Sequence, residues 1–312
     1  LAFSSGMAAV DAVMNLFAPG DHIITGNDLY GGSFRLFRNI NARNCVEFTT
    51  VHTSKLEEIK AAIKPNTKAI FLETPTNPTM EISDLRAISK IAKENNFLVI
   101  VDNTFLTPYF QKPLTLGADI VIHSGTKYIA GHNDVLAGFT VVKEQTLADK
   151  LRLIYKTTGA CLGALDAWLV IRGIKTLPLR MEQHQKNAAA IAAWLQKQPR
   201  VQYVLYPGLV EHPGYAVNKS QTSGFGGMIS FAVDNAETAR QILEGVKLIQ
   251  FAESLGGTES LITYPIRQTH TDLTPEECAE KGITDCLLRL STGIEATDDL
   301  IADLAQAFAA VE

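Results

Sequence analysis

Several short polar segments follow apolar, strand-like runs, and each carries a side chain that can do chemistry. Asp102 follows FLVIV, Lys127 follows DIVIH, Asn77 follows AIFLE, and Gly6 opens a helix-like run after FSS. Because open parallel sheets bind ligands at the carboxyl ends of their strands, we expect these positions to converge on one site.

Lys127 is a candidate nucleophile. A lysine amine attacks a carbonyl only when it is neutral, and desolvation or a neighbouring charge lowers its pKa toward that state. It follows a strand that we expect to be buried, beside Ser124 and Thr126, whose hydroxyls could hold a phosphate. Taken alone, the residue is also compatible with a solvated loop lysine, which describes most lysines.

Asp102 ends an apolar strand, where an unpaired carboxylate would cost several kcal/mol, so it needs a cationic or hydrogen-bonding partner. A protonated pyridine nitrogen would be such a partner. A pyridine ring that is kept protonated withdraws electrons from a substrate carbanion. The alternative is structural, in which Asp102 caps the turn-like Asp-Asn-Thr segment.

Two further segments could hold a flat anionic ligand. Gly6 and Met7 begin a helix after a pair of serines, and the free amides and dipole of a helix start favour a phosphate. Tyr30, in LYGGSF, could stack on a heterocycle. Without other evidence the serines merely cap the helix and Tyr30 packs in the core.

Arg289 lies inside the apolar run LLRLSTGIE, where a guanidinium needs a carboxylate-like partner. Its planar fork suits the carboxylate of an amino acid, and an internal salt bridge with one of the protein's own acids is an equal alternative. Ser254 in ESLGGTESL and Thr269 in YPIRQTH add polar groups beside it.

The elements that must position these residues form an α/β chain. In the first half, short β-branched runs alternate with helical periodicity, which predicts parallel strands joined by helical crossovers. The clearest crossover is a helix at 83–95 with Ser83 as its N-cap. The predicted strands are 22–26, 45–49, 68–72, 97–102 and 119–123.

The pattern shifts near residue 175. A long helix at 178–197, the strand MISFAVD and the closing helix DDLIADLAQAFAAV indicate a second, smaller α/β domain. We therefore predict a large domain at 1–174 and a small C-terminal domain at 175–312, which the length of 312 residues allows.

Composition excludes several classes of protein. Hydrophobic residues make up 46% and charged residues 20%, which argues against disorder, and the net charge of -5 provides no basic footprint for nucleic acid. Four cysteines without CxxC spacing argue against a zinc site and a disulfide framework. No apolar run reaches the roughly 18 residues that a membrane span needs. We expect a cytoplasmic protein with reduced thiols and no metal.

A set of motifs occurs in order along the chain: SSGMAAV, LYGG, ETPTNPT, VDNTF, HSGTKYIAGH, ESLGGTESLI and LLRLSTGIE. Together they resemble the signature of the Cys/Met-metabolism pyridoxal-phosphate (PLP) enzymes, the trans-sulfuration family. The resemblance implies an aspartate-aminotransferase-like, type I PLP-dependent transferase fold, PLP as cofactor, an amino-acid substrate and usually a homotetramer built as a dimer of dimers.

The resemblance also implies roles for the cofactor-binding residues. Lys127 would be the Schiff-base lysine, Asp102 the partner of the pyridine nitrogen, and Tyr30 the aromatic that stacks on the ring and assists proton transfer. The phosphate would be held by the backbone of Gly6 and Met7 and the hydroxyls of Ser124 and Thr126.

On the substrate side, the resemblance implies that Asn77 and Arg289 grip the substrate carboxylate. Ser254 would lie close to Lys127, and Thr269 would orient Arg289. Members of the family carry several dozen residues before the SSGM motif, including a Tyr-x-Arg segment that reaches the phosphate of the neighbouring subunit. Because the sequence begins at Leu1 within an apolar run, we expect that such an N-terminal segment is missing from it.

Two positions favour a cystathionine enzyme within the family. Glu253 resembles the acid of cystathionine γ-lyases and γ-synthases and could attract the distal ammonium of cystathionine, and Gly32 stands where methionine γ-lyases typically carry cysteine. We expect γ-elimination of cystathionine to cysteine, 2-oxobutanoate and ammonia. The alternatives are cystathionine γ-synthase, which acts on an activated homoserine, methionine γ-lyase and cystathionine β-lyase. From another class, the alternative is a non-catalytic PLP-binding protein.

Overall fold

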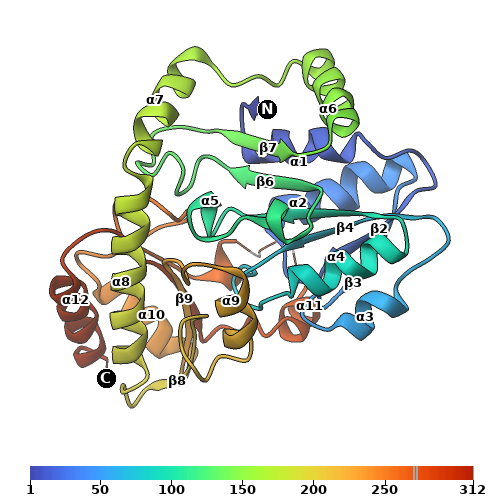
Figure 1. The fold of residues 1–312 in the computed structure, drawn as a ribbon. Coiled ribbons are helices and arrows are strands. Elements are labelled where there is room, and N and C mark those ends of the chain that lie inside the picture. Colours follow the sequence, from blue (N-terminus) through green and yellow to red (C-terminus); the bar gives the residue numbers. More distant parts are fainter. Residues whose placement is uncertain (270, 272, 312) are drawn as a thin grey trace.

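The chain forms two β-sheets with helices packed against them in the computed structural model, which describes residues 1–269, 271 and 273–311 (Figure 1). The seven-stranded sheet has the order β1-β7-β6-β5-β4-β2-β3. Its strands are β1 (Ala2–Phe3), β2 (His22–Gly26), β3 (Glu47–Val51), β4 (Thr67–Glu73), β5 (Leu98–Asp102), β6 (Ile120–Ser124) and β7 (Gly138–Val142).

The strands from β2 to β6 pair in parallel, as the sequence predicts. On the other side of β6 the sheet continues with β7 and the edge strand β1, which the sequence analysis did not predict and which pair antiparallel. The predicted strand at 45–49 begins two residues later, because Cys45 has a φ of 58° and closes a turn before β3. A residue in that left-handed conformation cannot be part of a strand.

Neighbouring residues of the central strands point into two different cores, since side chains alternate across a sheet. One core contains residues of α1 (Gly6–Met14) together with Ile23, Phe71, Ile100 and Ile122. The other contains residues of α3 (Leu56–Ala61) and α4 (Leu85–Glu94) together with Ile24, Ile70, Val99 and Val121. The strands are therefore apolar on both faces because helices cover both faces.

The predicted N-cap of α4 was wrong by one residue. The cap is Asp84, whose Oδ1 accepts a hydrogen bond from the Ala87 N–H at 3.0 Å. Ser83 is fully buried, and its hydroxyl bonds instead to that of Thr53 at 2.7 Å. A buried hydroxyl with a tertiary partner is not free to cap a helix.

The five-stranded sheet has the order β10-β11-β12-β9-β8 and packs against α8, α10 and α12, as the core of this half of the molecule shows. Its strands are β8 (Val201–Leu205), β9 (Met228–Val233), β10 (Gln250–Phe251), β11 (Leu261–Thr263) and β12 (Leu287–Ser291). The predicted α/β class, with a mostly parallel larger sheet and a smaller C-terminal unit, is confirmed. The boundary at 174/175 stays a prediction.

The remaining helices connect the strands and cover the two sheets. In Figure 1, α7 lies at the top of the view, and the long α8 runs from it along the smaller sheet. These helices are α2 (Gly31–Leu36), α5 (Thr107–Phe110), α6 (Gln145–Thr158), α7 (Ala164–Ile174), α8 (Leu177–Leu195), α9 (Tyr215–Gln221), α10 (Ala236–Gly245), α11 (Pro275–Glu280) and α12 (Thr297–Ala309), with short turns η1 (Phe37–Asn41), η2 (Ala42–Asn44), η3 (Pro113–Leu116) and η4 (Pro265–Arg267).

Across the described part of the chain, no helix has the length and apolar character needed to cross a membrane. The same residues contain no cluster of three or more His, Cys, Asp or Glu side chains that could hold a metal ion.

Candidate active site

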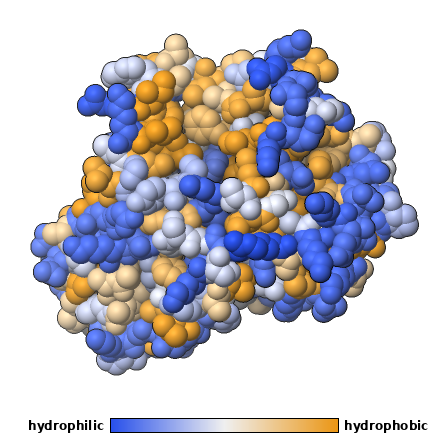
Figure 2. Space-filling view, in the orientation of Figure 1, coloured by the Kyte–Doolittle hydropathy of each residue, from blue (hydrophilic) through white to orange (hydrophobic). Residues whose placement is uncertain are grey.

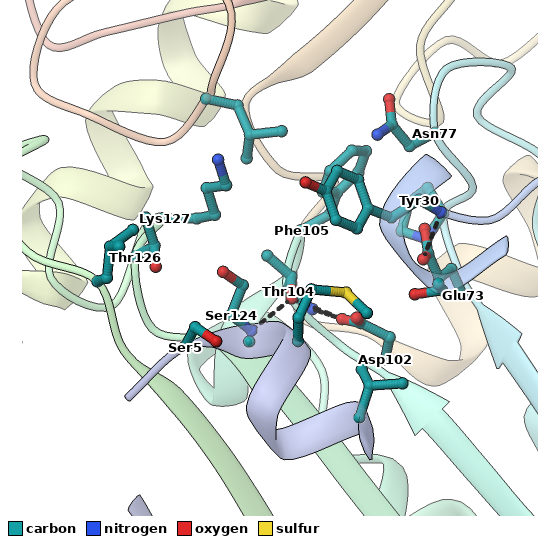
Figure 3. Close-up of a pocket in the computed structure, with 17 residues that line it drawn as sticks. Ser5, Tyr30, Glu73, Asn77, Asp102, Thr104, Phe105, Ser124, Thr126 and Lys127 are labelled. Atoms are coloured by element: carbon teal, nitrogen blue, oxygen red, sulfur yellow. Dashed lines mark hydrogen bonds between the residues drawn. The ribbon is translucent and has the colours of Figure 1, made fainter. Parts of the chain in front are cut away.

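A cavity opens at the carboxyl ends of β4, β5 and β6, beside the start of α1 (Figure 3). A second pocket adjoins it on the side of the smaller sheet and shares Tyr30, Asn77 and Lys127 with it. The structure brings every residue singled out in the sequence to one of these two pockets. The first is lined by Gly6, Met7, Tyr30, Asn77, Asp102, Ser124, Thr126 and Lys127, and the second also by Glu253, Ser254, Thr269 and Arg289.

The strand pattern explains why three polar side chains reach the same cavity. Asp102 lies two residues after Ile100, and Ser124 two residues after Ile122, so both continue the sheet face that packs against α1. Glu73 follows Phe71 in the same way at the end of β4. On this face each strand presents an apolar side chain two residues before its end, and its last residue presents a polar side chain to the cavity.

Lys127 is partly buried, and its Nζ donates a hydrogen bond to Ser254 Oγ at 2.8 Å. Burial, helped by the positive charge of Arg289, lowers the pKa of Lys127 to about 8, and only Glu253 opposes the shift. A substantial fraction of neutral amine is therefore present at mildly alkaline pH. Lys127 is not a solvated loop lysine.

Asp102 has both features that the sequence analysis weighed against each other. Its Oδ1 accepts hydrogen bonds from the N–H and the hydroxyl of Thr104, at 3.0 and 2.5 Å, so it caps the turn after β5. It also lines the cavity. Burial raises its pKa, although the two bonds from Thr104 oppose the shift. A cation placed in the cavity would relieve this burial cost.

Glu73 is a buried acid of the cavity that the sequence analysis missed. Its Oε1 accepts a hydrogen bond from the Tyr30 N–H at 2.8 Å (Figure 3). Burial, with smaller contributions from the charges of Asp102 and Asp28, raises its pKa well above the usual range. The signal was present in the sequence, because AIFLE is an apolar strand that ends in an acid just as LVIVD does.

The start of α1 forms a close-fitting wall of the cavity. Ser5, not Ser4, caps the helix, and its Oγ accepts from the Ala8 N–H at 3.0 Å. A Cβ added to Gly6 would lie 2.9 Å from the Cβ of Ser124, so only glycine lets the helix start approach β6 this closely. The first amides of a helix have no partner within it and can face an anion.

The hydroxyl of Thr126 is engaged with the backbone of Ala137, from whose N–H it accepts at 3.1 Å and to whose carbonyl it donates at 3.3 Å. Ser124 is held by its own N–H, which donates to Thr104 Oγ1 at 2.8 Å. The loop after β6 is therefore anchored on both sides, with Thr104 tying it to Asp102.

Tyr30 does not pack in the core. Its side chain belongs to both pockets, and 44% of the residue is exposed. A Cβ added to Gly32 would lie 2.5 Å from Tyr30 Cε1, so the glycine leaves the room that this ring occupies. The exposed ring face is available for a flat ligand.

Arg289 is almost completely buried, with 1% of its surface exposed. Its Nη1 donates to Asn77 Oδ1 at 2.8 Å, and its Nη2 donates to the Ser254 carbonyl at 3.0 Å and to Thr263 Oγ1 at 3.1 Å. Burial lowers its pKa to about 10. Among the described residues no carboxylate forms an ion pair with Arg289, so an internal salt bridge does not hold it.

Two more polar groups, one behind Arg289 and one in the pocket, escaped the sequence analysis. Thr263, on β11, pairs in register with Arg289 on β12 and supplies a hydroxyl that accepts from the guanidinium. Arg35, on α2, lines the same pocket as Glu253. Thr269 also lines this pocket, and its role in orienting Arg289 stays a prediction.

The family model for "Cys/Met metabolism PLP-dependent enzyme" matches residues 1–309. The chain belongs to this family. It is 52% identical over 306 residues to a cystathionine γ-lyase of Bacillus subtilis, and the match covers 98% of this chain and 81% of that protein. It is also 52% identical over 309 residues to a cystathionine γ-synthase of Haemophilus influenzae, with 99% and 79% of the two chains covered.

Among solved structures, the cystathionine γ-lyase of Lactobacillus plantarum in complex with L-serine superposes with a TM-score of 0.98 at 46% identity. The superposition covers 100% of this chain and 82% of that one. The predicted fold of the trans-sulfuration enzymes is thereby confirmed along the whole chain.

The residues around the cavity fit the PLP on which this family depends. A buried acid of raised pKa faces it from β5, a lysine of lowered pKa faces it from the loop after β6, and a glycine-walled helix start can receive a phosphate. The exposed ring of Tyr30 completes the set.

Proposed function

We propose that this protein is a PLP-dependent carbon–sulfur lyase that cleaves cystathionine by γ-elimination to cysteine, 2-oxobutanoate and ammonia. The proposal depends mainly on one observation: the Lys127 amine lies within hydrogen-bond distance of Ser254, whose carbonyl in turn binds Arg289. A base and a carboxylate-binding fork are thus held a short distance apart, as a reaction at the α-carbon of an amino acid requires.

PLP would be held by groups that the cavity already presents. The α1 amides at Gly6 and Met7, with the hydroxyl of Ser124, would receive its phosphate. Thr126 would join them only by turning away the hydroxyl proton that it donates to the Ala137 carbonyl. Asp102 would face its ring nitrogen, and Tyr30 would stack on its ring. When bound, PLP draws electron density away from the α-carbon of the substrate.

Lys127 would first hold the cofactor and then, once displaced by the substrate amine, act as the base. Its lowered pKa favours the neutral amine, whose Nζ can remove the α-proton. The hydroxyl of Ser254 would keep this nitrogen pointed into the pocket between the two events.

Arg289 and Asn77 would bind the substrate carboxylate. The hydrogen bonds from Arg289 to Asn77 and Thr263 fix the plane of the guanidinium before the substrate arrives, so little orientation entropy is lost on binding. Two more charged side chains line the second pocket, the acidic Glu253 and the basic Arg35. These two charges would receive the second amino-acid end of cystathionine, its ammonium and carboxylate respectively.

We further propose that the protein assembles as a homotetramer. Apolar side chains repeat along one face of α7 and stay more than half exposed, at 68% for Leu165, 57% for Trp168 and 61% for Ile171. Figure 2 shows apolar surface gathered over this region at the top of the molecule. Exposed apolar patches of this kind mark interfaces. Light scattering coupled to size exclusion tests the assembly, and a monomer would contradict it.

A cystathionine γ-synthase reaction is the second candidate, because the chain is as similar to a γ-synthase as to a γ-lyase. The deciding experiment supplies cystathionine alone, or an activated homoserine with cysteine, to the PLP-loaded protein. Release of 2-oxobutanoate from cystathionine at the faster rate supports the lyase. Faster formation of cystathionine supports the synthase, and pyruvate release would indicate β-elimination.

A further inference from the structure

Glu73 occupies an unusual position for an acid that the proposed mechanism does not use. It is buried at the end of β4, where it pairs in register with Asp102 at the end of β5. Side chains in register on neighbouring strands lie on the same face of the sheet, so the two carboxyl groups enter the cavity together. Asp28, buried in the turn before α2, adds a third acid nearby.

The contact that Glu73 makes is to the backbone that carries Tyr30. Tyr30 is the residue before α2, and no side chain of its own caps that helix. Its N–H donates to Glu73 Oε1 at 2.8 Å. Tyr30 is 44% exposed, and its carbonyl accepts from Ser33 and Phe34 at the start of α2. The bond to Glu73 therefore holds the N–H side of the backbone from which the ring projects.

We propose that Glu73 is a positioning residue whose neutral carboxyl group accepts the Tyr30 N–H and thereby sets the Tyr30 ring over the cavity floor formed with Asp102. This inference rests on the proposed PLP site. The acids Asp102 and Asp28 face Glu73 from β5 and from the turn before α2, and the part of the chain that the structure describes shows no ion pair to any of the three. Ionising all of them in one buried region would be costly, which keeps Glu73 neutral.

A neutral acceptor and a negative charge make different predictions for Glu73→Gln, whereas both predict a loss for Glu73→Met. In Glu73→Gln the amide oxygen can still accept the Tyr30 N–H and the charge is removed. In Glu73→Met both the acceptor and the charge are lost at similar volume. Glu58→Met is the matched control, because Glu58 accepts the His52 N–H at 2.9 Å in the same way but lies away from both pockets.

The readouts are the dissociation constant of PLP, from equilibrium dialysis of the loaded protein, and the visible circular dichroism of bound PLP, which reports how the ring is held. We expect Glu73→Gln and Glu58→Met to stay within about twofold of the parent protein. Glu73→Met should weaken PLP binding roughly tenfold, as expected for losing one buried hydrogen bond, and should reduce the dichroic band. A roughly tenfold loss in Glu73→Gln would show that the charge matters and would overturn the proposal.

A double-mutant cycle with Tyr30→Ala tests whether Glu73 acts through the ring. If it does, Glu73→Met should change PLP affinity by less than about twofold once the ring is gone. Equal effects in both backgrounds would overturn the proposal. None of these readouts requires cystathionine cleavage. If the protein binds PLP but does not cleave cystathionine, these readouts can still be measured. If the parent protein does not bind PLP, the proposed function is contradicted before the role of Glu73 is tested.

Discussion

The amine of Lys127 and the guanidinium of Arg289 are joined through one residue: Ser254 accepts from Lys127 with its hydroxyl and from Arg289 with its carbonyl, at 2.8 and 3.0 Å. Ser254 has a φ of 94°, in the left-handed region. A non-glycine residue held there costs about 1–3 kcal/mol, which neighbouring contacts must offset. Ser254 thus sets the spacing between the proposed base, Lys127, and the proposed carboxylate-binding group, Arg289.

Ser254→Ala tests this connection. It keeps the carbonyl that holds Arg289 but removes the acceptor for Lys127, so kcat should fall by about tenfold while KM changes less. Steady-state kinetics with cystathionine measure both constants. Ser223→Ala, which removes an exposed hydroxyl that bonds to backbone, is the control. A large rise in KM with unchanged kcat would mean that Ser254 serves the carboxylate site instead.

The lowered pKa of Lys127 predicts how fast PLP combines with PLP-depleted protein at different pH values. Only the neutral amine reacts, so with a pKa of about 8 the association rate should rise about fivefold between pH 7 and pH 8 and level off above pH 9. Stopped-flow absorbance follows the reaction. A rate that keeps climbing tenfold per pH unit beyond pH 9 would indicate an ordinary, unperturbed lysine.

Asp102→Asn separates function from stability. The amide oxygen can still accept from Thr104, but it no longer provides a negative charge for a ring nitrogen, so kcat should fall by about 100-fold or more. Because the folded-state pKa of Asp102 is raised, the folded state binds this proton more tightly than the unfolded state. That contribution to stability is lost as the pH rises.

At pH 7, PLP-depleted Asp102→Asn should therefore melt at the same temperature as the parent protein or higher. Differential scanning calorimetry checks this expectation. A lower melting temperature would mean that the ionised carboxylate stabilises the empty fold.

Arg289→Lys should be a damaging substitution despite the retained charge. A lysine cannot reproduce the fork that bonds to Asn77, Ser254 and Thr263, and these partners would lose their donor inside the protein. We expect KM for cystathionine to rise by about 10- to 100-fold. The control is Arg86→Lys on α4, because the Arg86 guanidinium bonds to an exposed backbone carbonyl. An unchanged KM would remove Arg289 from the substrate site.

Patterns local in the sequence predicted the large sheet well. FLVIV, AIFLE and DIVIH carry apolar side chains on both faces, which is typical of parallel strands covered by helices on both sides. β7 was missed because it turns back antiparallel directly after the loop that holds Lys127, without the helical crossover that signalled the other strands.

Contacts between distant segments could not be read from the sequence. Thr263 meets Arg289 only because β11 and β12 pair in a particular register, and no local pattern specifies that register. For Glu73 the acid at the end of AIFLE was visible in the sequence, but its contact with the Tyr30 N–H and its register with Asp102 exist only in the fold.

The most direct test is borohydride reduction of the PLP-loaded protein, followed by proteolysis and mass spectrometry. Reduction converts a bond between the cofactor and a lysine amine into a stable one. The account predicts loss of the visible absorption band and a single pyridoxyl-modified peptide containing Lys127. Modification of another lysine, or of none, would contradict it.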